Sequence, residues 1–196
     1  MDLAEAAAAL GRGEVIGFPT DTVYGLAVRP GFESRVYDIK RRPQGMPLIL
    51  MAASPDQLSG LVEVDRRARW YMDRWWPGPL TLVLPAEAGG TLGVRVPDHP
   101  LALELLRLAG PLLTTSANLH GEPPALDAAF ASLPGLAGVV DGGRAPGGEP
   151  STVIALLPGS EMTVIREGAI SSHLLGDDEH LRSDARRSRV GEFGPA

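Results

Sequence analysis

The amino-acid sequence predicts one α/β or α+β domain built on a mixed β-sheet, and three observations lead to that fold class. The chain has 196 residues, a length that suits one domain of ordinary size. Hydrophobic residues make up 44% of it, enough to form a core. Short apolar runs alternate with amphipathic segments in some places and follow one another directly elsewhere, which is typical of a mixed sheet.

In the first third of the chain, each expected element has its own boundary signal. Residues 2–10 favour a helix that the following glycines end, and the short apolar run 14–18 favours a strand. Residues 33–41 favour a second helix, which Pro43 stops. The sequence PLILMAA at 47–53 is continuously apolar and therefore predicts a buried strand.

The middle of the chain continues with two helices and a pair of strands. Residues 55–61 and 65–76 have helical patterns, and a Pro-Gly-Pro sequence breaks the chain after the second. The runs 80–84 and 91–96 are expected to form two strands around a glycine-rich turn. An amphipathic pattern predicts a helix at 100–109.

The last part of the domain is expected to be rich in strands. Its elements are a strand at 112–115, a short helix at 127–132, strands at 137–140, 151–157 and 162–166, and a helical turn at about 169–175. From Gly176 onward the chain is charged and poor in apolar residues. We therefore expect residues 1–175 to form the domain and residues 176–196 to be a disordered charged tail.

The composition argues against several classes of function. Cysteine is absent, which removes disulfides, thiol nucleophiles and thiolate metal sites. The four histidines show no recognised metal-binding spacing, so we expect no metal site built from protein side chains. The sequence also lacks a Walker A loop, a G-x-G-x-x-G fingerprint and a G-x-S-x-G elbow.

Charge and hydropathy narrow the expected partners further. No apolar run approaches the roughly 18 residues of a membrane span, and the acidic, helix-favouring N-terminus does not resemble a signal peptide. We therefore expect a cytoplasmic protein with no membrane partner. The net charge of −6 argues against a general nucleic-acid coat protein but leaves room for a local basic groove.

The segment FPTDTVYGL, residues 18–26, places hydroxyl groups directly after a predicted strand. In an extended segment Thr20 and Thr22 point to the same side. Loops at strand ends are common places for ligand sites, so these hydroxyls are candidates for binding a small polar ligand. The alternative is that Thr and Asp cap a local turn.

The second polar pair is Lys40 and Arg42. Lys40 is the only lysine among 18 basic residues. Because Pro43 moves Arg42 out of helical geometry, both cations can converge on one point, where a compact ammonium and a planar guanidinium suit a polyphosphate. The alternatives are chance and a solvated helix C-terminus.

Further polar residues flank apolar strands. Ser116 and Asn118, in TTSAN, are uncharged and suit hydrogen bonds to a phosphate, a ribose or a base, or else an Asx-type turn. Arg95, within GVRVP, either covers a sheet edge or binds a carboxylate bidentately. Ser151 and Arg166 also lie beside apolar strands.

These candidates share a chemistry. They are cations and hydroxyls with few acids, and no nucleophile has an adjacent base. Such a set suits a site that positions anionic substrates and neutralises their charge. The glycine-rich segment GGRAPGG, residues 142–148, is either a flexible loop or a phosphate cradle.

Eight motifs in this order resemble the YrdC-like family, the threonylcarbamoyl-AMP synthases. They are FPTDTVYGL, the K-R-R-P of 40–43, PLIL, WPGPLTLVL, GVRVPDHP, TSANLHGEPP, PSTV and IREGAI. The resemblance covers nearly the whole predicted domain. It implies a single twisted mixed sheet flanked by helices, of the YrdC/RibB-like kind, with a concave positive surface.

The resemblance also implies an activity. Such enzymes are nucleotidyltransferases that condense L-threonine, bicarbonate or CO2, and ATP into L-threonylcarbamoyladenylate and pyrophosphate, with Mg²⁺ accompanying the ATP. The product supplies the threonylcarbamoyl group of N6-threonylcarbamoyladenosine in tRNA. A tRNA threonylcarbamoyltransferase complex would therefore be the downstream partner.

Matching the motifs residue by residue assigns roles. The resemblance implies that Thr22 contacts the substrate threonine and that Arg95 holds its carboxylate. It places Ser116 and Ser151 near the threonine or the carbamate. The residues that it places along the ATP or adenylate are Lys40, Arg42, Thr91, Asn118 and Arg166, of which Lys40 and Arg42 are the expected catalytic cations.

The chain departs from the family pattern at a few positions. Met46 stands where some relatives carry Asn or Lys, and Met51 stands where some carry His. Leu126 stands where some relatives carry Ser or Thr. His120 replaces the usual Ser of SANxSG. Side-chain contacts made there by relatives are not expected in this chain.

Two other classes of function compete with the synthase. One is an RNA-binding or ribosome-assembly factor that uses the same concave surface, although aromatic residues, which would stack on bases, are only 5% of the chain. The other is a carbamoyl-transfer module of the hydrogenase-maturation kind. Those modules sit in longer chains with zinc-finger and acylphosphatase parts.

Overall fold

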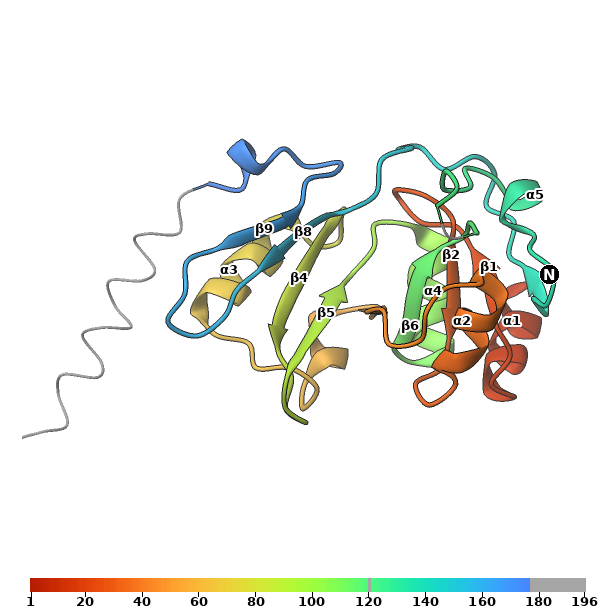
Figure 1. Ribbon diagram of the computed structural model, residues 1–196, viewed down its shortest axis with the longest axis horizontal. Helices are drawn as coiled ribbons and strands as arrows, with labels where there is room; N and C mark the ends of the chain where they lie inside the picture. The colour runs from red at the N-terminus through yellow and green to blue at the C-terminus, as the bar shows by residue number, and fades with distance from the viewer. Residues whose placement is uncertain (120, 177–196) are drawn as a thin grey trace, which may run out of the picture.

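A nine-stranded β-sheet organises the part of the chain described by the computed structural model, residues 1–119 and 121–176 (Figure 1). The strands are β1 Ile16–Phe18, β2 Gly25–Val28, β3 Ile49–Met51, β4 Leu80–Pro85, β5 Thr91–Arg95, β6 Leu112–Ser116, β7 Gly138–Val139, β8 Thr152–Ala155 and β9 Thr163–Arg166. Their order across the sheet is β7-β1-β2-β6-β3-β5-β4-β8-β9.

The sheet is mixed, as the sequence predicts. The pairs β1–β7, β3–β5 and β4–β8 are parallel, and the remaining neighbours are antiparallel. Helices and 3-10 turns surround it. They are α1 Leu3–Gly11, α2 Glu33–Lys40, η1 Pro55–Leu58, α3 Arg66–Trp75, α4 Pro100–Ala109, α5 Ala128–Ala131 and η2 Ser172–Leu174.

Two core regions lie on one face of the sheet and join at Leu113. In the first, Tyr71 and Met72 of α3 pack against apolar residues of β4 and β5. In the second, Val36 of α2 packs against β2. Leu113 touches both regions. Figure 1 shows α3 at the β9 end of the sheet and α2 at the β1 end.

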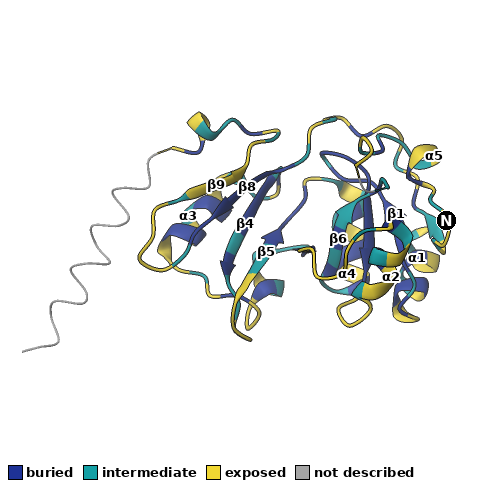
Figure 2. Ribbon diagram, in the orientation of Figure 1, coloured by how far each residue is buried: buried dark blue, intermediate teal, exposed yellow. Residues whose placement is uncertain are grey.

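The opposite face is covered over only part of its width. Leu10 of α1 and Leu105 and Leu106 of α4 pack there against residues of β1, β3 and β6. Figure 2 shows these buried inner faces in dark blue against the yellow outer faces of the helices.

Beyond β3, on β5 and β4, the same face also carries polar side chains. Side chains alternate along a strand, so Thr81 points away from the core face that Leu80 and Leu82 enter. A Cβ at Gly93 would lie 3.7 Å from both Thr81 and Ile49, which shows that these residues share one face. The polar side chains of Thr81 and Arg95 thus share this part of the face with the apolar side chain of Val83.

Several expected elements differ from the structure. The strand Gly25–Val28 was not predicted, because its four residues follow the polar loop without a recognisable alternation. The helix expected at 55–61 is only the 3-10 turn Pro55–Leu58, since Pro55 starts it and Gly60 follows in a left-handed conformation. The turn expected at about 169–175 is η2 alone.

The expected tail, residues 176–196, lies outside the described residues except for Gly176. His120 lies outside them as well. Within the described parts of the chain, no helix is both long enough and apolar enough to cross a membrane.

Candidate functional site

The loop between β1 and β2 folds its two threonines inward. Thr20 and Thr22 are 1% and 2% exposed, and their hydroxyl oxygens lie 3.0 Å apart. The Thr20 hydroxyl donates to the carbonyl of Val23 and accepts from the amide of Thr22. The interpretation as a capped local turn is therefore confirmed at Thr20, while Thr22 presents its hydroxyl to a neighbouring element and its binding of a ligand stays a prediction.

That neighbouring element is the end of β5, where Arg95 is 2% exposed. Its guanidinium donates to the Thr22 hydroxyl at 3.2 Å, to the carbonyl of Gly78 at 3.0 Å and to Asp21 Oδ1 at 2.6 Å. Burial lowers the pKa of Arg95, and the Asp21 carboxylate acts in the opposite direction. We call Asp21, Thr22 and Arg95 the Arg95 cluster.

Asp21 is the member of this cluster that the sequence analysis did not select. It was considered only as a turn residue, yet its carboxylate forms the ion pair with Arg95, 74 positions away. The position of Asp21 between Thr20 and Thr22, just after a strand, is the sequence feature that could have identified it as a site residue. Of the two interpretations of Arg95, the sheet-edge one is wrong, because β5 lies between β3 and β4, and bidentate binding of a carboxylate stays a prediction, because Asp21 contacts Arg95 through one oxygen.

Ser151 and Arg166 lie further across the sheet from Arg95. The Ser151 hydroxyl is 2.9 Å from that of Thr81, and Ser151 is 3% exposed. Arg166, at the end of β9, donates to the carbonyl of Ser151 at 2.8 Å and reaches its hydroxyl at 3.3 Å. The positive charge of Arg166 contributes to the lowered pKa of Arg95, because the two guanidinium groups repel each other.

A buried threonine holds the segment that follows Arg166. Thr152, which is 0% exposed, donates to the carbonyl of Ile170 and accepts from the amides of Gly168 and Ile170. A Cβ at Gly168 would lie 2.2 Å from the carbonyl oxygen of Pro150, so only glycine fits there. This packing fixes the position of Arg166.

The second group of predicted residues lies at the end of β6. Lys40, 3% exposed, donates to the carbonyls of Ser116 and Asn118 and to Asn118 Oδ1, at 2.5, 2.6 and 3.2 Å. The Ser116 hydroxyl donates to the same Asn118 oxygen. We call Lys40, Ser116 and Asn118 the Lys40 cluster.

The end of α2 explains how Lys40 reaches this point. The helix stops because Arg41 takes a left-handed conformation with φ 51°. Arg42 then turns back, with its amide bonded to the carbonyl of Tyr37. The expectation that Pro43 alone ends the helix is therefore incomplete, since the reversal begins two residues earlier.

Arg42 lies beside the Lys40 cluster. Its guanidinium donates to the Thr115 hydroxyl at 3.1 Å and to the carbonyl of Pro47 at 3.3 Å, and it lies over the ring of Tyr37. Its charge adds to burial, the larger cause, in lowering the pKa of Lys40 to about 8. The two cations therefore lie near each other with separate hydrogen-bond partners, and their convergence on one ligand stays a prediction.

The glycine-rich segment 142–148 packs against the β1–β2 loop. The amide of Gly148 donates to the carbonyl of Thr22 at 3.0 Å, and a Cβ at Gly147 would lie 3.1 Å from that same oxygen. The hydroxyl of Tyr24 donates to the carbonyl of Gly143 and accepts from the amide of Gly142. These contacts favour a positioning role over a phosphate cradle.

Thr91 is the predicted site residue that the structure places apart. It is exposed at the start of β5, paired with Pro85 across the β4–β5 hairpin. It shares the face of Gly93 and Arg95 but lies four residues from Arg95, or about 13 Å along the strand. No described residue joins it to either cluster by a hydrogen bond.

Three of the four departures from the family pattern lie within the described residues and have different surroundings. Met51 is buried in the core under α4, whereas Met46 is exposed and its carbonyl accepts from the Tyr37 hydroxyl. Leu126 lines a cleft of about 390 Å³ together with Asn118, and its carbonyl accepts from the amide of Ala145.

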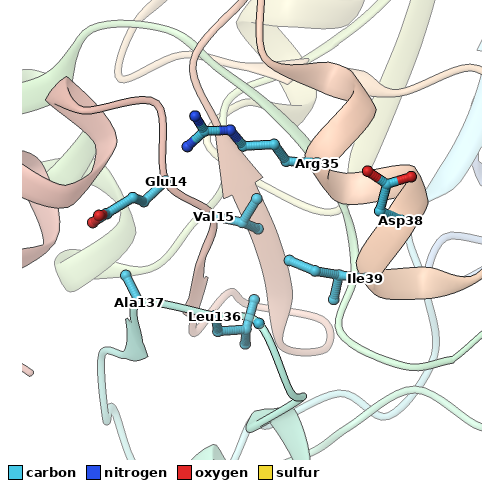
Figure 3. A pocket seen from close by; sticks show the side chains of 8 residues that line it. Glu14, Val15, Arg35, Asp38, Ile39, Leu136 and Ala137 are labelled. Carbon is cyan, nitrogen blue, oxygen red and sulfur yellow. The ribbon is translucent and has the colours of Figure 1, made fainter.

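Another cleft, of about 450 Å³, contains none of the predicted site residues (Figure 3). Figure 3 shows a floor of Val15, Ile39 and Leu136 beside the charged side chains of Glu14, Arg35 and Asp38. Within this cleft, Arg35 donates to the carbonyl of Gly13 at 2.8 Å.

The two clusters suit different ligands. The Arg95 cluster contains both signs of charge in a buried setting, whereas the Lys40 cluster holds its ammonium with neutral oxygens only. Among the described residues, no group of three or more His, Cys, Asp or Glu side chains could hold a metal ion.

Comparison with protein families gives one match that spans most of the chain. The model of the Sua5/YciO/YrdC family, described as "Telomere recombination", matches residues 8–168. A Bacillus subtilis protein named threonylcarbamoyl-AMP synthase is 41% identical over 171 residues, covering 78% of this chain and 49% of that protein. The chain thus spans about half the length of that relative.

A shorter relative and two solved structures extend the comparison. A threonylcarbamoyl-AMP synthase of Xanthomonas euvesicatoria is 38% identical over 78% of this chain and 92% of its own length. The crystal structure of P. abyssi Sua5 complexed with L-threonine has a TM-score of 0.83 and 34% identity, covering 88% of this chain and 56% of that one. E. coli YciO has a TM-score of 0.75 and 29% identity, with 90% and 91% covered. These structures confirm the predicted fold class.

Proposed function

The chain belongs to the Sua5/YciO/YrdC family, and on that premise we propose that it is an L-threonylcarbamoyladenylate synthase. It would condense L-threonine, bicarbonate or CO2, and ATP into threonylcarbamoyl-AMP and pyrophosphate. The observation that carries the proposal is the division of the site into a buried Arg–Asp cluster and a lysine with no carboxylate neighbour among the described residues. An amino acid and a polyphosphate need these two environments.

At the Lys40 cluster, the proposal places the phosphates of ATP. Lys40 is held by three oxygen atoms, none of them a carboxylate, so its positive charge remains available to an anion. Arg42 adds a second cation beside it, and Arg166, which lies across the sheet beside Ser151, would reach the nucleotide from β9. Preorganised cations of this kind offset the charge that develops as a phosphoryl group is transferred.

At the Arg95 cluster, the proposal places L-threonine. The guanidinium would hold the substrate carboxylate, and Thr22, already bonded to it, would contact the substrate beside it. The Ser151 hydroxyl lies on the route from Arg95 to Arg166, where the carbamate would form. Thr91 and Asn118 would contact the nucleotide from the two sides of the site.

The chemistry is an addition followed by a displacement. The neutral amine of threonine adds to CO2 and loses a proton, which gives a carbamate. A carbamate oxygen then attacks the α-phosphorus of ATP, and the bond from that phosphorus to the β-phosphate bridging oxygen breaks, which releases pyrophosphate. We propose that Mg²⁺ enters on the ATP phosphates, because Mg²⁺ favours phosphate oxygens and water over the side chains present.

The product would be consumed by a tRNA threonylcarbamoyltransferase complex, which places the proposed activity in the cytoplasm. The alternative, an RNA-binding factor, is less favoured, because the relatives that match over most of this chain are named as synthases. RNA binding that depends steeply on salt and requires neither ATP nor threonine would favour the RNA-binding factor instead.

The experiment that tests the proposal is pyrophosphate release from ATP. Purified protein is assayed with ATP and Mg²⁺, with and without L-threonine and bicarbonate, and with L-serine in place of threonine. We expect release that requires both threonine and bicarbonate and falls with serine. A folded, ATP-binding protein that releases no pyrophosphate under any of these conditions would overturn the proposal.

A further inference from the structure

Asp21 has a carboxylate of which only one oxygen is used. Its Oδ1 pairs with Arg95 Nη2 at 2.6 Å. Its Oδ2 is buried and has no hydrogen-bond partner among the described residues. The side chain is 11% exposed. An ionised oxygen left unpaired in the interior is costly, and so this one requires an explanation.

The rest of the loop argues against loose packing as that explanation. The hydroxyl of Thr20 is bonded on both sides, and the carbonyl of Thr22 accepts from Gly148. The hydroxyl of Tyr24 both donates and accepts. The free oxygen of Asp21 is therefore an exception within a well-bonded segment.

Arg95 complements this free oxygen with unused donors. A guanidinium has five N–H groups. Three of them serve Gly78, Thr22 and Asp21 in the structure, which leaves two. Two N–H groups are what a carboxylate needs for bidentate binding. The Arg95 cluster thus contains one unpaired carboxylate oxygen, on Asp21, and two N–H groups of Arg95 that make none of these three hydrogen bonds.

This combination matches an α-amino acid, whose carboxylate and ammonium are attached to the same carbon. We propose that Asp21 Oδ2 accepts a hydrogen bond from the α-ammonium of the amino-acid substrate while Arg95 holds its carboxylate. The inference rests on the proposed function and adds to it a specificity-determining residue. Asp21 would make the site select amino acids over otherwise identical acids that lack the amine.

The surroundings of Asp21 support this assignment. His99 is the other titratable side chain whose electrostatic interaction with Asp21 is resolved. Burial lowers the pKa of His99 below its ordinary value, although Asp21 and Asp98 act in the opposite direction. His99 Nδ1 is itself buried without a hydrogen-bond partner among the described residues, so it does not occupy Asp21 Oδ2.

The test measures binding by calorimetry, without ATP, so that it does not depend on activity. The ligands are L-threonine and (R)-3-hydroxybutanoate, which lacks only the amine. In the unaltered protein we expect threonine to bind at least tenfold more tightly. Asp21→Asn keeps the size of the side chain and removes its charge, so threonine binding should weaken by about 10- to 100-fold, while hydroxybutanoate binding, which has no ammonium contact to lose, should not weaken. Asp56→Asn, at an exposed aspartate of η1, is the matched control and should change neither affinity.

The outcomes separate this inference from the proposed function. If the unaltered protein does not bind threonine at all, both fail. If it binds threonine but Asp21→Asn binds threonine equally well or more tightly, only the inference fails, and tighter binding would show that Asp21 competes with the substrate for Arg95. If Asp21→Asn does not fold, the comparison of the two ligands in the unaltered protein decides, and a preference below about threefold for threonine overturns the inference.

Discussion

The Arg95 and Lys40 clusters bury one cation each, but only the cation of the Arg95 cluster is paired with a carboxylate among the described residues. Arg95 is paired with a protein carboxylate at 2.6 Å. Lys40 has three oxygen partners, but within the described residues no acidic side chain is in ion-pair distance. Both side chains are 3% exposed or less, so burial alone does not explain the difference.

Under the proposed function, the difference would let one site accept two ligands of different charge. A preformed ion pair is close to neutral and suits a zwitterion, which brings both signs of charge. Burying the Lys40 ammonium among neutral oxygens costs desolvation free energy, and the lowered pKa of Lys40 reflects this cost. A bound polyanion would offset the cost by pairing with the ammonium. The predictions below alter one cluster at a time.

The largest expected effect on stability comes from removing Arg95. Arg95→Met leaves the Asp21 carboxylate buried without its cation, which should lower the free energy of unfolding by about 3–5 kcal/mol. Urea denaturation measures this loss. The double variant Asp21→Asn/Arg95→Met should lose less than the single one, because no charge is then left unpaired. A loss below about 1 kcal/mol, the size expected for an exposed pair, would contradict a buried cluster.

The largest expected effect on turnover comes from Lys40. Lys40→Ala should reduce kcat/KM for ATP by about 10²- to 10³-fold, since it removes a preorganised cation from the phosphate end of the site. Steady-state pyrophosphate release measures the change. Arg107→Ala, at an exposed cation on α4, is the control and should leave the rate unchanged. Near-normal turnover of Lys40→Ala at saturating ATP would show that Lys40 is not central.

The pH dependence of the reaction should report the same residue. Because the pKa of Lys40 is lowered to about 8, kcat/KM for ATP should fall as the pH rises through 8 and the ammonium is lost. Lys40→Arg, if active, should lack this basic limb, because arginine keeps its charge. An identical limb in both proteins would assign the titration to another group.

Stability should change with pH in the opposite sense. The folded pKa of Lys40 is below its unfolded value of 10.5, so the unfolded chain binds more protons between about pH 8 and 10.5. The contribution of Lys40 to the free energy of unfolding should therefore rise with pH across this window. Below pH 8 the penalty of burying the ammonium is fully present. Lys40→Met should remove the rise that is due to this residue.

A smaller effect is expected from the glycine-rich loop that supports the Arg95 cluster. In Gly147→Ala the added methyl would approach the carbonyl of Thr22 to 3.1 Å, so the loop must shift. We expect KM for threonine to rise about threefold to tenfold, with KM for ATP unchanged. Gly11→Ala, where the methyl meets no atom within 4 Å, is the matched control. Equal changes in both KM values would indicate that the loop supports the whole site.

Local spacing selected the residues of the Lys40 cluster as members of two separate pairs, but it did not predict that the pairs meet. Lys40 and Arg42 lie two residues apart across a helix end, and Ser116 and Asn118 lie two residues apart after a strand. The structure brings the two pairs together because α2 packs on β2, which pairs with β6. The mixed sheet was likewise predicted from patterns that are local in the sequence.

The Arg95 cluster depends on contacts that local patterns do not contain. Asp21 and Arg95 are 74 positions apart, and Tyr24 reaches Gly143 across 119. Their meeting follows from the order of the strands, which single-sequence patterns do not fix. The missed strand Gly25–Val28 belongs to the same problem, because it is recognisable only through its pairing with β1 and β6.

The central claim is that the two clusters bind different substrates, and paired calorimetric titrations test it most directly. Lys40→Ala and Arg95→Lys, which preserves the charge at residue 95, are each titrated with the non-hydrolysed analogue of MgATP and with L-threonine. We predict that Lys40→Ala loses affinity for the nucleotide and keeps its affinity for threonine, and that Arg95→Lys does the reverse. If both variants lose affinity for the same ligand, or for both ligands equally, the division of the site is wrong.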